Sequence, residues 1–209
     1  MPGLVIQGGV AVGNDVVDLG DPVITRHYQR PRFVERVLCE EERERLRIAR
    51  DPHRLLWCLF AAKEAAYKVV SRCLGEPPPF AHRKYRVAPG LDRVHVIDHS
   101  LVLNLTVTCS DEWAHAVAAT PGKTALAGVE EVGIGVDPSA AARAVLCLAL
   151  ADRLGCAASD LEVVRPPRAR SWDGFGPPCL LRRGVGAPVD ISLSHDGRWV
   201  GFAAALETT

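Results

Sequence analysis

The segment that most restricts the fold of this chain is residues 60–70, which read FAAKEAAYKVV. Apolar side chains here surround nearly the whole circumference of a helix, so the helix must lie inside a protein core. Three charged residues interrupt that apolar surface: Lys63, Glu64 and Lys68. A charge inside a core is retained only where it has a partner or a ligand. The segment therefore predicts a buried helix whose charged side chains contact a partner or a ligand.

The types of charged residue indicate what they contact. Glu64 and Lys68 are four residues apart and share one helix face, so an exposed ion pair worth a few tenths of a kcal/mol is the simplest interpretation. However, only four of the 25 basic residues are lysines, and two of them are here. Lysine acts as a compact point charge on phosphate groups. The alternative hypothesis is that Lys63 and Lys68 bind a phosphorylated ligand.

Composition excludes several classes of partner. The chain has 209 residues, 48% of them apolar, and its 25 acidic residues balance its 25 basic ones. Such a chain can form one large domain or two small ones, with no overall field to attract nucleic acid or a membrane. The N-terminal residues lack the pattern of a signal peptide, and seven cysteines are scattered without paired spacing. We expect reduced thiols, no zinc site and a cytoplasmic location.

Periodicity and turn residues predict an α+β fold. Helices are expected at 32–50, at 51–75 and at 139–155, the last with Ser139 as its N-cap. Strands are expected within 4–18 and at 83–88, 93–97, 101–108, 115–120 and 160–164, with a short one after the junction at 121. Five prolines indicate a long irregular loop at 165–188, and 189–206 is expected to form a hairpin that turns at HDGR.

Two segments resemble each other. When residues 106–120 are aligned with 192–206, Trp113 meets Trp199, and Ala118 and Ala119 meet Ala204 and Ala205. Each threonine of a Thr-x-Thr pattern also meets a serine of a Ser-x-Ser pattern. We interpret this similarity as the trace of two structurally similar halves that have diverged.

Carboxylates from two elements form a candidate metal site. Asp15 follows a glycine in the strand GNDVVD, and it shares a strand face with Val17, whereas Asp18 points the other way. Asp18 is expected to be solvated or to cap the next segment. Asp15 together with Glu64, with lysines nearby, suits a hard cation that bridges phosphates.

The segment SLSHDG carries a second group of polar residues. Ser192 and Ser194 lie on one strand face, and His195 lies at the turn. His195 can serve as a turn residue that hydrogen-bonds the backbone. It can also grip a phosphate together with a serine hydroxyl. A catalytic triad is not indicated, because no Gly-x-Ser-x-Gly elbow precedes a helix.

Together these motifs are similar to those of the 4′-phosphopantetheinyl transferases. GNDVVDL, FAAKEAAYKV and ISLSHDGRWVGFAAA resemble that family's Gly-x-Asp strand, Lys-Glu-Ala helix and Ser-x-Ser-His segment. The resemblance implies an α+β pseudodimer of two similar halves. It also implies transfer of 4′-phosphopantetheine from coenzyme A to a serine of an apo acyl or peptidyl carrier protein, with Mg²⁺ as cofactor.

The resemblance assigns roles to individual residues. Asp15 and Glu64 match the magnesium ligands, with Glu64 the favoured base, and Lys63 and Lys68 match the lysines near the coenzyme A phosphates. Ser194 and His195 match the segment that contacts the 3′-phosphoadenosine portion. Two departures concern the metal and the nucleotide. Val17 replaces a second acidic residue, so a water would fill that metal position. The family's Gly-Lys-Pro motif reads Gly-Pro-Pro at 176–178, leaving Arg168, Arg170 and Arg182 as substitutes for its lysine.

The order of the motifs is also unusual for the two-half branch of that family. The Gly-x-Asp and Lys-Glu-Ala half comes first here, within 1–120, followed by a junction at 121–137 and the Ser-x-Ser-His half at 138–209. We therefore expect a circularly permuted pseudodimer that is active as a monomer. The alternative is a homologue without activity that binds a carrier protein or a nucleotide.

Overall fold

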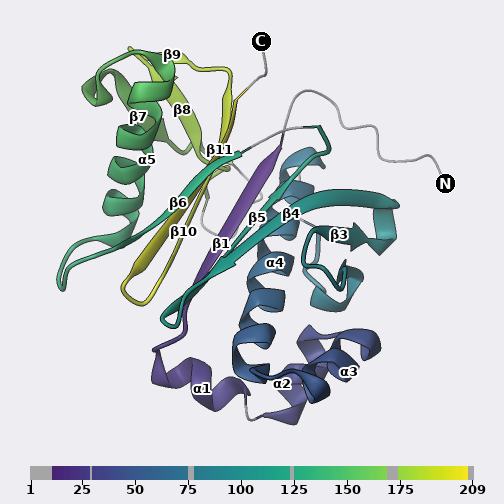
Figure 1. The fold of residues 1–209 in the computed structure, drawn as a ribbon. Coiled ribbons are helices and arrows are strands. Elements are labelled where there is room, and N and C mark those ends of the chain that lie inside the picture. The colour runs from purple at the N-terminus through teal and green to yellow at the C-terminus, as the bar shows by residue number, and fades with distance from the viewer. Residues whose placement is uncertain (1–10, 29, 75–77, 123–124, 169–173, 207–209) are drawn as a thin grey trace.

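The structure is a computed structural model that describes residues 11–28, 30–74, 78–122, 125–168 and 174–206. It confirms the expected α+β fold, with two main sheets that are each covered by one long helix (Figure 1). The part of the chain before residue 11, where the first strand was also expected, lies outside the described residues. None of the described helices is both long and apolar enough to cross a membrane.

The first sheet has five strands in the order β1-β5-β4-β3-β2. Its strands are β1 (Val12–Asp18), β2 (Tyr85–Val87), β3 (Arg93–Val96), β4 (Leu101–Cys109) and β5 (Trp113–Ala119). The helices of this half are α1 (Pro22–Tyr28), α2 (Pro31–Val37), α3 (Glu40–Ile48) and α4 (Pro52–Cys73), with short 3₁₀ turns η1 (His82–Lys84) and η2 (Ile97–His99). Apolar residues of α4 pack against this sheet and form the larger core.

Helix α4 confirms the central prediction, but the helix expected at 32–50 is two helices. The Asp51 side chain caps α4 by accepting a hydrogen bond from the Arg54 amide at 2.9 Å. Between α2 and α3 the backbone of Cys39 is extended, and the Glu42 carboxylate accepts from the Cys39 amide at 2.9 Å. This capping contact turns Glu42 inward, where it also accepts from the Val87 amide. A tertiary role of one glutamate therefore interrupts the helical periodicity.

The second sheet has the order β10-β11-β6, with α5 (Pro138–Leu154) packed on it. Its strands are β6 (Ala125–Glu131), β10 (Val189–Asp196) and β11 (Trp199–Leu206). A small sheet contains β7 (Leu161–Val164), β8 (Cys179–Arg182) and β9 (Val185–Gly186), and the 3₁₀ turn η3 (Ala158–Asp160) precedes it.

The short strand expected after residue 121 is present as β6, which pairs with β11 in the second sheet. Two other details of this half differ from the sequence expectations. Asp137, not Ser139, is the N-cap of α5, because its side chain accepts from the Ser139 amide and Pro138 occupies the first helical position. The expected loop at 165–188 contains β8 and β9, which pair over a short stretch. The sequence did not predict them, because the prolines and glycines of this segment indicated a loop.

Both halves share one connectivity. In each, a strand is followed by the long helix and then by a hairpin: β1, α4, β4 and β5 in the first, β6, α5, β10 and β11 in the second. The sheet orders β1-β5-β4 and β6-β11-β10 correspond. Trp113 and Trp199 begin the equivalent strands β5 and β11, with ring centroids 6.2 Å apart. The similarity of 106–120 and 192–206 therefore coincides with equivalent hairpins.

The two sheets meet where edge strand β1 lies along edge strand β10. Alternate side chains of β10 accept hydrogen bonds from alternate amides of β1, taking the place of a backbone ladder. The pairs are Val12 N to Asp190 Oδ2 (2.6 Å), Asn14 N to Ser192 Oγ (3.0 Å) and Asp18 N to Asp196 Oδ2 (2.9 Å). Behind this seam, small apolar residues of both sheets, such as Ala119 and Ala203, form a third core.

Candidate functional site

A close approach between β1 and α4 creates the polar centre of the first half. A Cβ atom at Gly13 would lie 2.1 Å from the Ala65 carbonyl oxygen and 3.1 Å from Lys68 Cβ, so only glycine allows α4 to lie this near. As a result, Lys68 Nζ donates to the Asn14 carbonyl oxygen at 2.7 Å and to Asp15 Oδ1 at 3.0 Å. The structure thus brings together Asp15 and Lys68 as the sequence predicted.

Glu64 adds a second negative charge to this centre. Its side chain is about one-quarter exposed, and its Oε1 lies 3.3 Å from His82 Nε2. The pKa of Asp15 is raised to about 6, mainly by burial, with a further increase from the Glu64 charge that Lys68 opposes. The protein alone therefore does not fully compensate the Asp15 carboxylate.

These two carboxylates are candidate ligands for a magnesium ion. Mg²⁺ is commonly held in proteins by one or two carboxylates, with substrate phosphates and waters completing its coordination. Asp15 and Glu64 could supply two such oxygen donors, and they are near enough for the Glu64 charge to raise the pKa of Asp15. Val17, which replaces a second acidic residue in the strand, is buried in the larger core and offers no ligand.

A cavity of about 470 Å³ extends from Lys68 between the two halves. It is bounded by α4, the start of α5, the segments around 165–168 and 175–178, and β10. Its cationic lining consists of Lys68, Arg72, Arg143, Arg165 and Arg168, with His195 beside them. Arg72 is already paired with Asp190 of β10. Cationic side chains of this kind bind phosphate groups in other proteins.

His195 and Ser194 occupy opposite sides of β10. His195 lines the cavity, and its Nε2 lies 3.5 Å from Ser139 Oγ at the start of α5. The Ser194 hydroxyl instead accepts from Asn14 Nδ2 at 2.7 Å in the seam and is almost fully buried. The predicted position of His195 agrees with a ligand site. Ser194 does not, because strand alternation turns it toward the first half.

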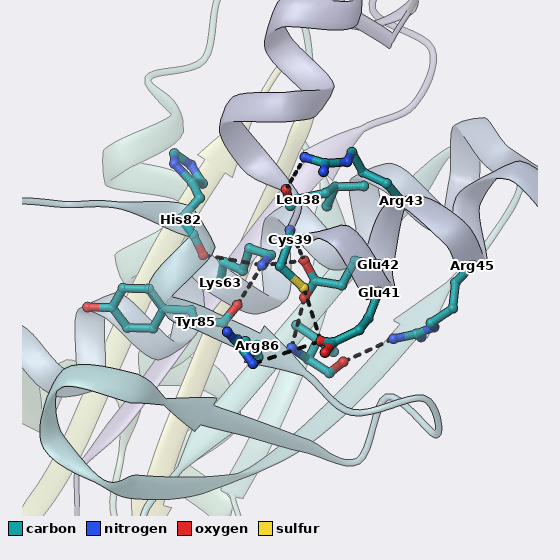
Figure 2. Close-up of polar contacts among 11 residues, drawn as sticks. Leu38, Cys39, Glu41, Glu42, Arg43, Arg45, Lys63, His82, Tyr85 and Arg86 are labelled. Atoms are coloured by element: carbon teal, nitrogen blue, oxygen red, sulfur yellow. Dashed lines mark hydrogen bonds and ion pairs between the residues drawn. The ribbon is translucent and has the colours of Figure 1, made fainter.

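Lys63 requires a similar correction (Figure 2). Its side chain is fully buried, and Nζ donates to Glu42 Oε2 at 2.8 Å and to the carbonyl oxygens of Tyr85 and His82 at 2.5 and 3.2 Å. Burial lowers the pKa of Lys63, whereas the Glu42 charge acts in the opposite direction. An ammonium has three hydrogens, and here all three have acceptors. Lys63 therefore holds α3, α4 and β2 together and has no donor left for a phosphate.

Of the arginines expected to replace the missing lysine, the structure places one at the cavity and another away from it. Arg168 lines the cavity, Arg182 is exposed on β8 away from it, and Arg170 lies outside the described residues. Arg143 and Arg165 also line it, and the sequence analysis missed both. Arg143 follows Ser139 by four residues, so the helical period could have placed them on one face. No local pattern marks Arg165, which contacts Phe175 and the Gly176 carbonyl through tertiary structure.

Comparisons with known proteins agree with these motifs. Residues 11–120 match the family model of the 4′-phosphopantetheinyl transferase superfamily. A holo-[acyl-carrier-protein] synthase from Azoarcus sp. (strain BH72) is 31% identical over 117 residues, which cover 51% of this chain and 93% of the relative. A crystal structure of Thermotoga maritima holo-[acyl-carrier-protein] synthase aligns over 84% of both chains with a TM-score of 0.38 and 15% identity.

Proposed function

Because the chain belongs to the 4′-phosphopantetheinyl transferase superfamily, we propose a specific reaction for it. The enzyme moves 4′-phosphopantetheine from coenzyme A to a serine hydroxyl of an apo acyl or peptidyl carrier protein. Adenosine 3′,5′-bisphosphate is released, and the reaction depends on Mg²⁺. The relative from Azoarcus, a holo-[acyl-carrier-protein] synthase by name, supports a carrier protein as the acceptor.

One observation carries this proposal: Lys68 belongs to both the carboxylate centre and the cavity. Its Nζ binds Asp15, and its side chain also lines the cavity that arginines surround. A diphosphate next to Lys68 would therefore lie between the carboxylates and a cationic nucleotide site. Such an arrangement would surround the transferred phosphoryl group with groups that stabilise its negative charge.

The cavity supports coenzyme A as the donor. Its volume of about 470 Å³ lies within the range of small-molecule sites, about 300–1,000 Å³. Arg143, Arg165 and Arg168 offer charge to phosphates, and the Phe175 ring and prolines 177 and 178 offer apolar contact. Arg165 and Arg168 lie beside the Gly-Pro-Pro sequence and can replace the lysine that the family has there.

The residues of the carboxylate centre can each be given a role. Asp15 and Glu64 would hold Mg²⁺, which when bound neutralises negative charge on the diphosphate. Lys68 would orient a phosphate oxygen while it keeps Asp15 in place. Glu64, at the edge of the centre and partly exposed, is the proposed acceptor of the serine proton.

The alternative is a homologue without activity that binds a carrier protein or nucleotide. Val17 and the Gly-Pro-Pro sequence favour it, because each replaces a polar residue of the family pattern. The Asp15–Lys68 contact with Glu64 nearby favours the enzyme, since a binding module needs no two carboxylates beside a lysine.

Mass spectrometry of an apo carrier protein separates the two. The protein, coenzyme A and Mg²⁺ should add one 4′-phosphopantetheine group to a fatty-acid, polyketide or peptide carrier. A carrier with the target serine replaced by alanine should gain nothing. Binding of coenzyme A by calorimetry without a mass gain on any of the three carriers would favour the binding module.

A further inference from the structure

His82 directs a buried ring nitrogen at the proposed catalytic carboxylate. It begins η1, and its Nε2 lies 3.3 Å from Glu64 Oε1. Within the described residues, no hydrogen bond of good geometry reaches this nitrogen, although it is buried. A buried polar atom without a partner is costly, and the Glu64 oxygen is within reach of a small rotation of either side chain.

The surroundings of His82 prevent its ring from turning away. The ring stacks on Phe60 with centroids 5.3 Å apart, and its centroid lies 4.1 Å from that of Phe80. The backbone carbonyl of His82 accepts from Lys63 Nζ at 3.2 Å, as Figure 2 shows. Consecutive residues of α4 thus contact His82 twice, since Lys63 holds its backbone and Glu64 faces its ring.

We propose that His82 is a positioning residue for Glu64. The proposal rests on the function proposed above. The His82 Nε2–H donates to Glu64 Oε1 and fixes the carboxylate, which leaves the other carboxylate oxygen free for Mg²⁺ or for the proton of the acceptor serine. Groups that hydrogen-bond a metal-ligating carboxylate commonly contribute about 10- to 100-fold to metal affinity or activity.

This role of His82 also connects the functions of Lys63 and Glu64, which are neighbours on α4. Lys63 has no contact with the cavity, yet its ammonium holds the carbonyl of the residue whose ring faces Glu64. The buried pair of Lys63 and Glu42 therefore fixes the backbone position of His82 and, through it, the His82–Glu64 contact.

Two substitutions separate positioning from packing. His82→Phe keeps a ring between Phe60 and Phe80 but removes the nitrogen donor. His82→Gln loses the ring but keeps an N–H at a similar distance. His95→Phe, on the exposed face of β3, is the matched control. Steady-state kinetics with an apo carrier protein, thermal unfolding, and calorimetry with MgCl₂ on the coenzyme A complex should be measured for each.

If His82 positions Glu64, His82→Phe lowers kcat about 10- to 100-fold and weakens Mg²⁺ binding similarly. The KM for coenzyme A stays within about twofold, because His82 does not line the cavity. His82→Gln recovers most of kcat despite its poorer packing. A His82→Phe enzyme with normal kcat and Mg²⁺ affinity overturns the proposal, as does a His82→Gln enzyme no better than His82→Phe.

A measurement independent of transfer keeps this inference separate from the proposed function. In ¹⁵N spectra of the histidine rings, the His82 Nε2 signal should be that of a protonated nitrogen, and Glu64→Gln should shift it. An unshifted signal refutes the contact even if the wild-type enzyme is active. A shifted signal in a protein that modifies no carrier would retain the contact and reject the proposed function.

Discussion

Lys63 Nζ lies 2.8 Å from Glu42 Oε2 in a place where both side chains are almost completely buried. Removal of one partner from such a pair leaves an uncompensated charge in the core, at a cost of about 3–5 kcal/mol. We expect Lys63→Met to lower the free energy of unfolding by this amount in urea denaturation. The double variant Lys63→Met/Glu42→Leu should recover part of the loss. Lys68→Met should cost less stability, because the Lys68 side chain is about one-third exposed, and it should lose transfer. The reverse pattern would reject this division of roles.

Replacement of Asp15 or Glu64 by alanine should abolish transfer. One remaining carboxylate cannot hold Mg²⁺ against bulk water and also position the diphosphate. Stability should change little, because burial and the Glu64 charge, which Lys68 only partly opposes, already raise the pKa of Asp15 to about 6. The assay is mass gain of the carrier protein at saturating Mg²⁺, with the exposed Asp152→Ala as control. Normal turnover by Glu64→Ala would disprove the site.

His195→Ala should raise the KM for coenzyme A more than it lowers kcat, because His195 lines the cavity where the 3′-phosphate is expected. It should hardly affect reaction with 3′-dephospho-coenzyme A, which lacks that group. Ser194→Ala is the matched comparison: it should leave both KM values unchanged and cost about 1 kcal/mol of stability through its bond to Asn14. If His195→Ala lowers kcat/KM equally for coenzyme A and for 3′-dephospho-coenzyme A, His195 has only a structural role at the turn.

His115 should make the protein less stable in mild acid. Burial lowers its pKa to about 4, with a smaller effect of the Lys68 charge, whereas the unfolded chain has the ordinary value of 6.5. The unfolded state therefore binds the proton first as pH falls. The stabilising contribution is complete above about pH 6.5 and is lost toward pH 4, by up to about 1.4 kcal/mol per pH unit. Urea denaturation across this range should show a shallower decline for His115→Gln.

The pseudodimer hypothesis predicts that one chain contains a complete site. Light scattering should give the mass of a monomer during active turnover. The amide of Val12 bonds to Asp190, and Leu206 pairs with Val189, so the described ends of the chain lie at the same place. A rearranged chain in the order 123–209, short linker, 1–121 should therefore fold and remain active. An obligate trimer, or an active fragment 1–121, would contradict a shared site.

The sequence predicted those parts of the structure that local periodicity determines. Helix α4 and the hairpin β10–β11 appear where apolar patterns and turn residues placed them. Lys63 was misassigned because neighbouring helical residues point about 100° apart, so a charged pair in sequence need not share a site. The break between α2 and α3 depends on Glu42 contacting a lysine 21 residues away, which no local pattern records.

Contacts between distant parts of the chain also determine the candidate site, so local sequence patterns predicted it only in part. Strand alternation correctly places Ser192 and Ser194 on one face, but which partner that face meets is decided by β1 from the other end of the chain. Arg165 reaches the cavity only because β10 and α4 enclose the same space.

The seam between β1 and β10 has a consequence for synthesis of the chain. The hydrogen bonds that cover the edge of β1 come from residues 178 positions later, so this edge stays open until almost the whole polypeptide has left the ribosome. An unpaired strand edge is a template for aggregation. Prematurely terminated chains that lack 189–206 should therefore be the species that aggregate and recruit chaperones, whereas the finished chain covers its own edge.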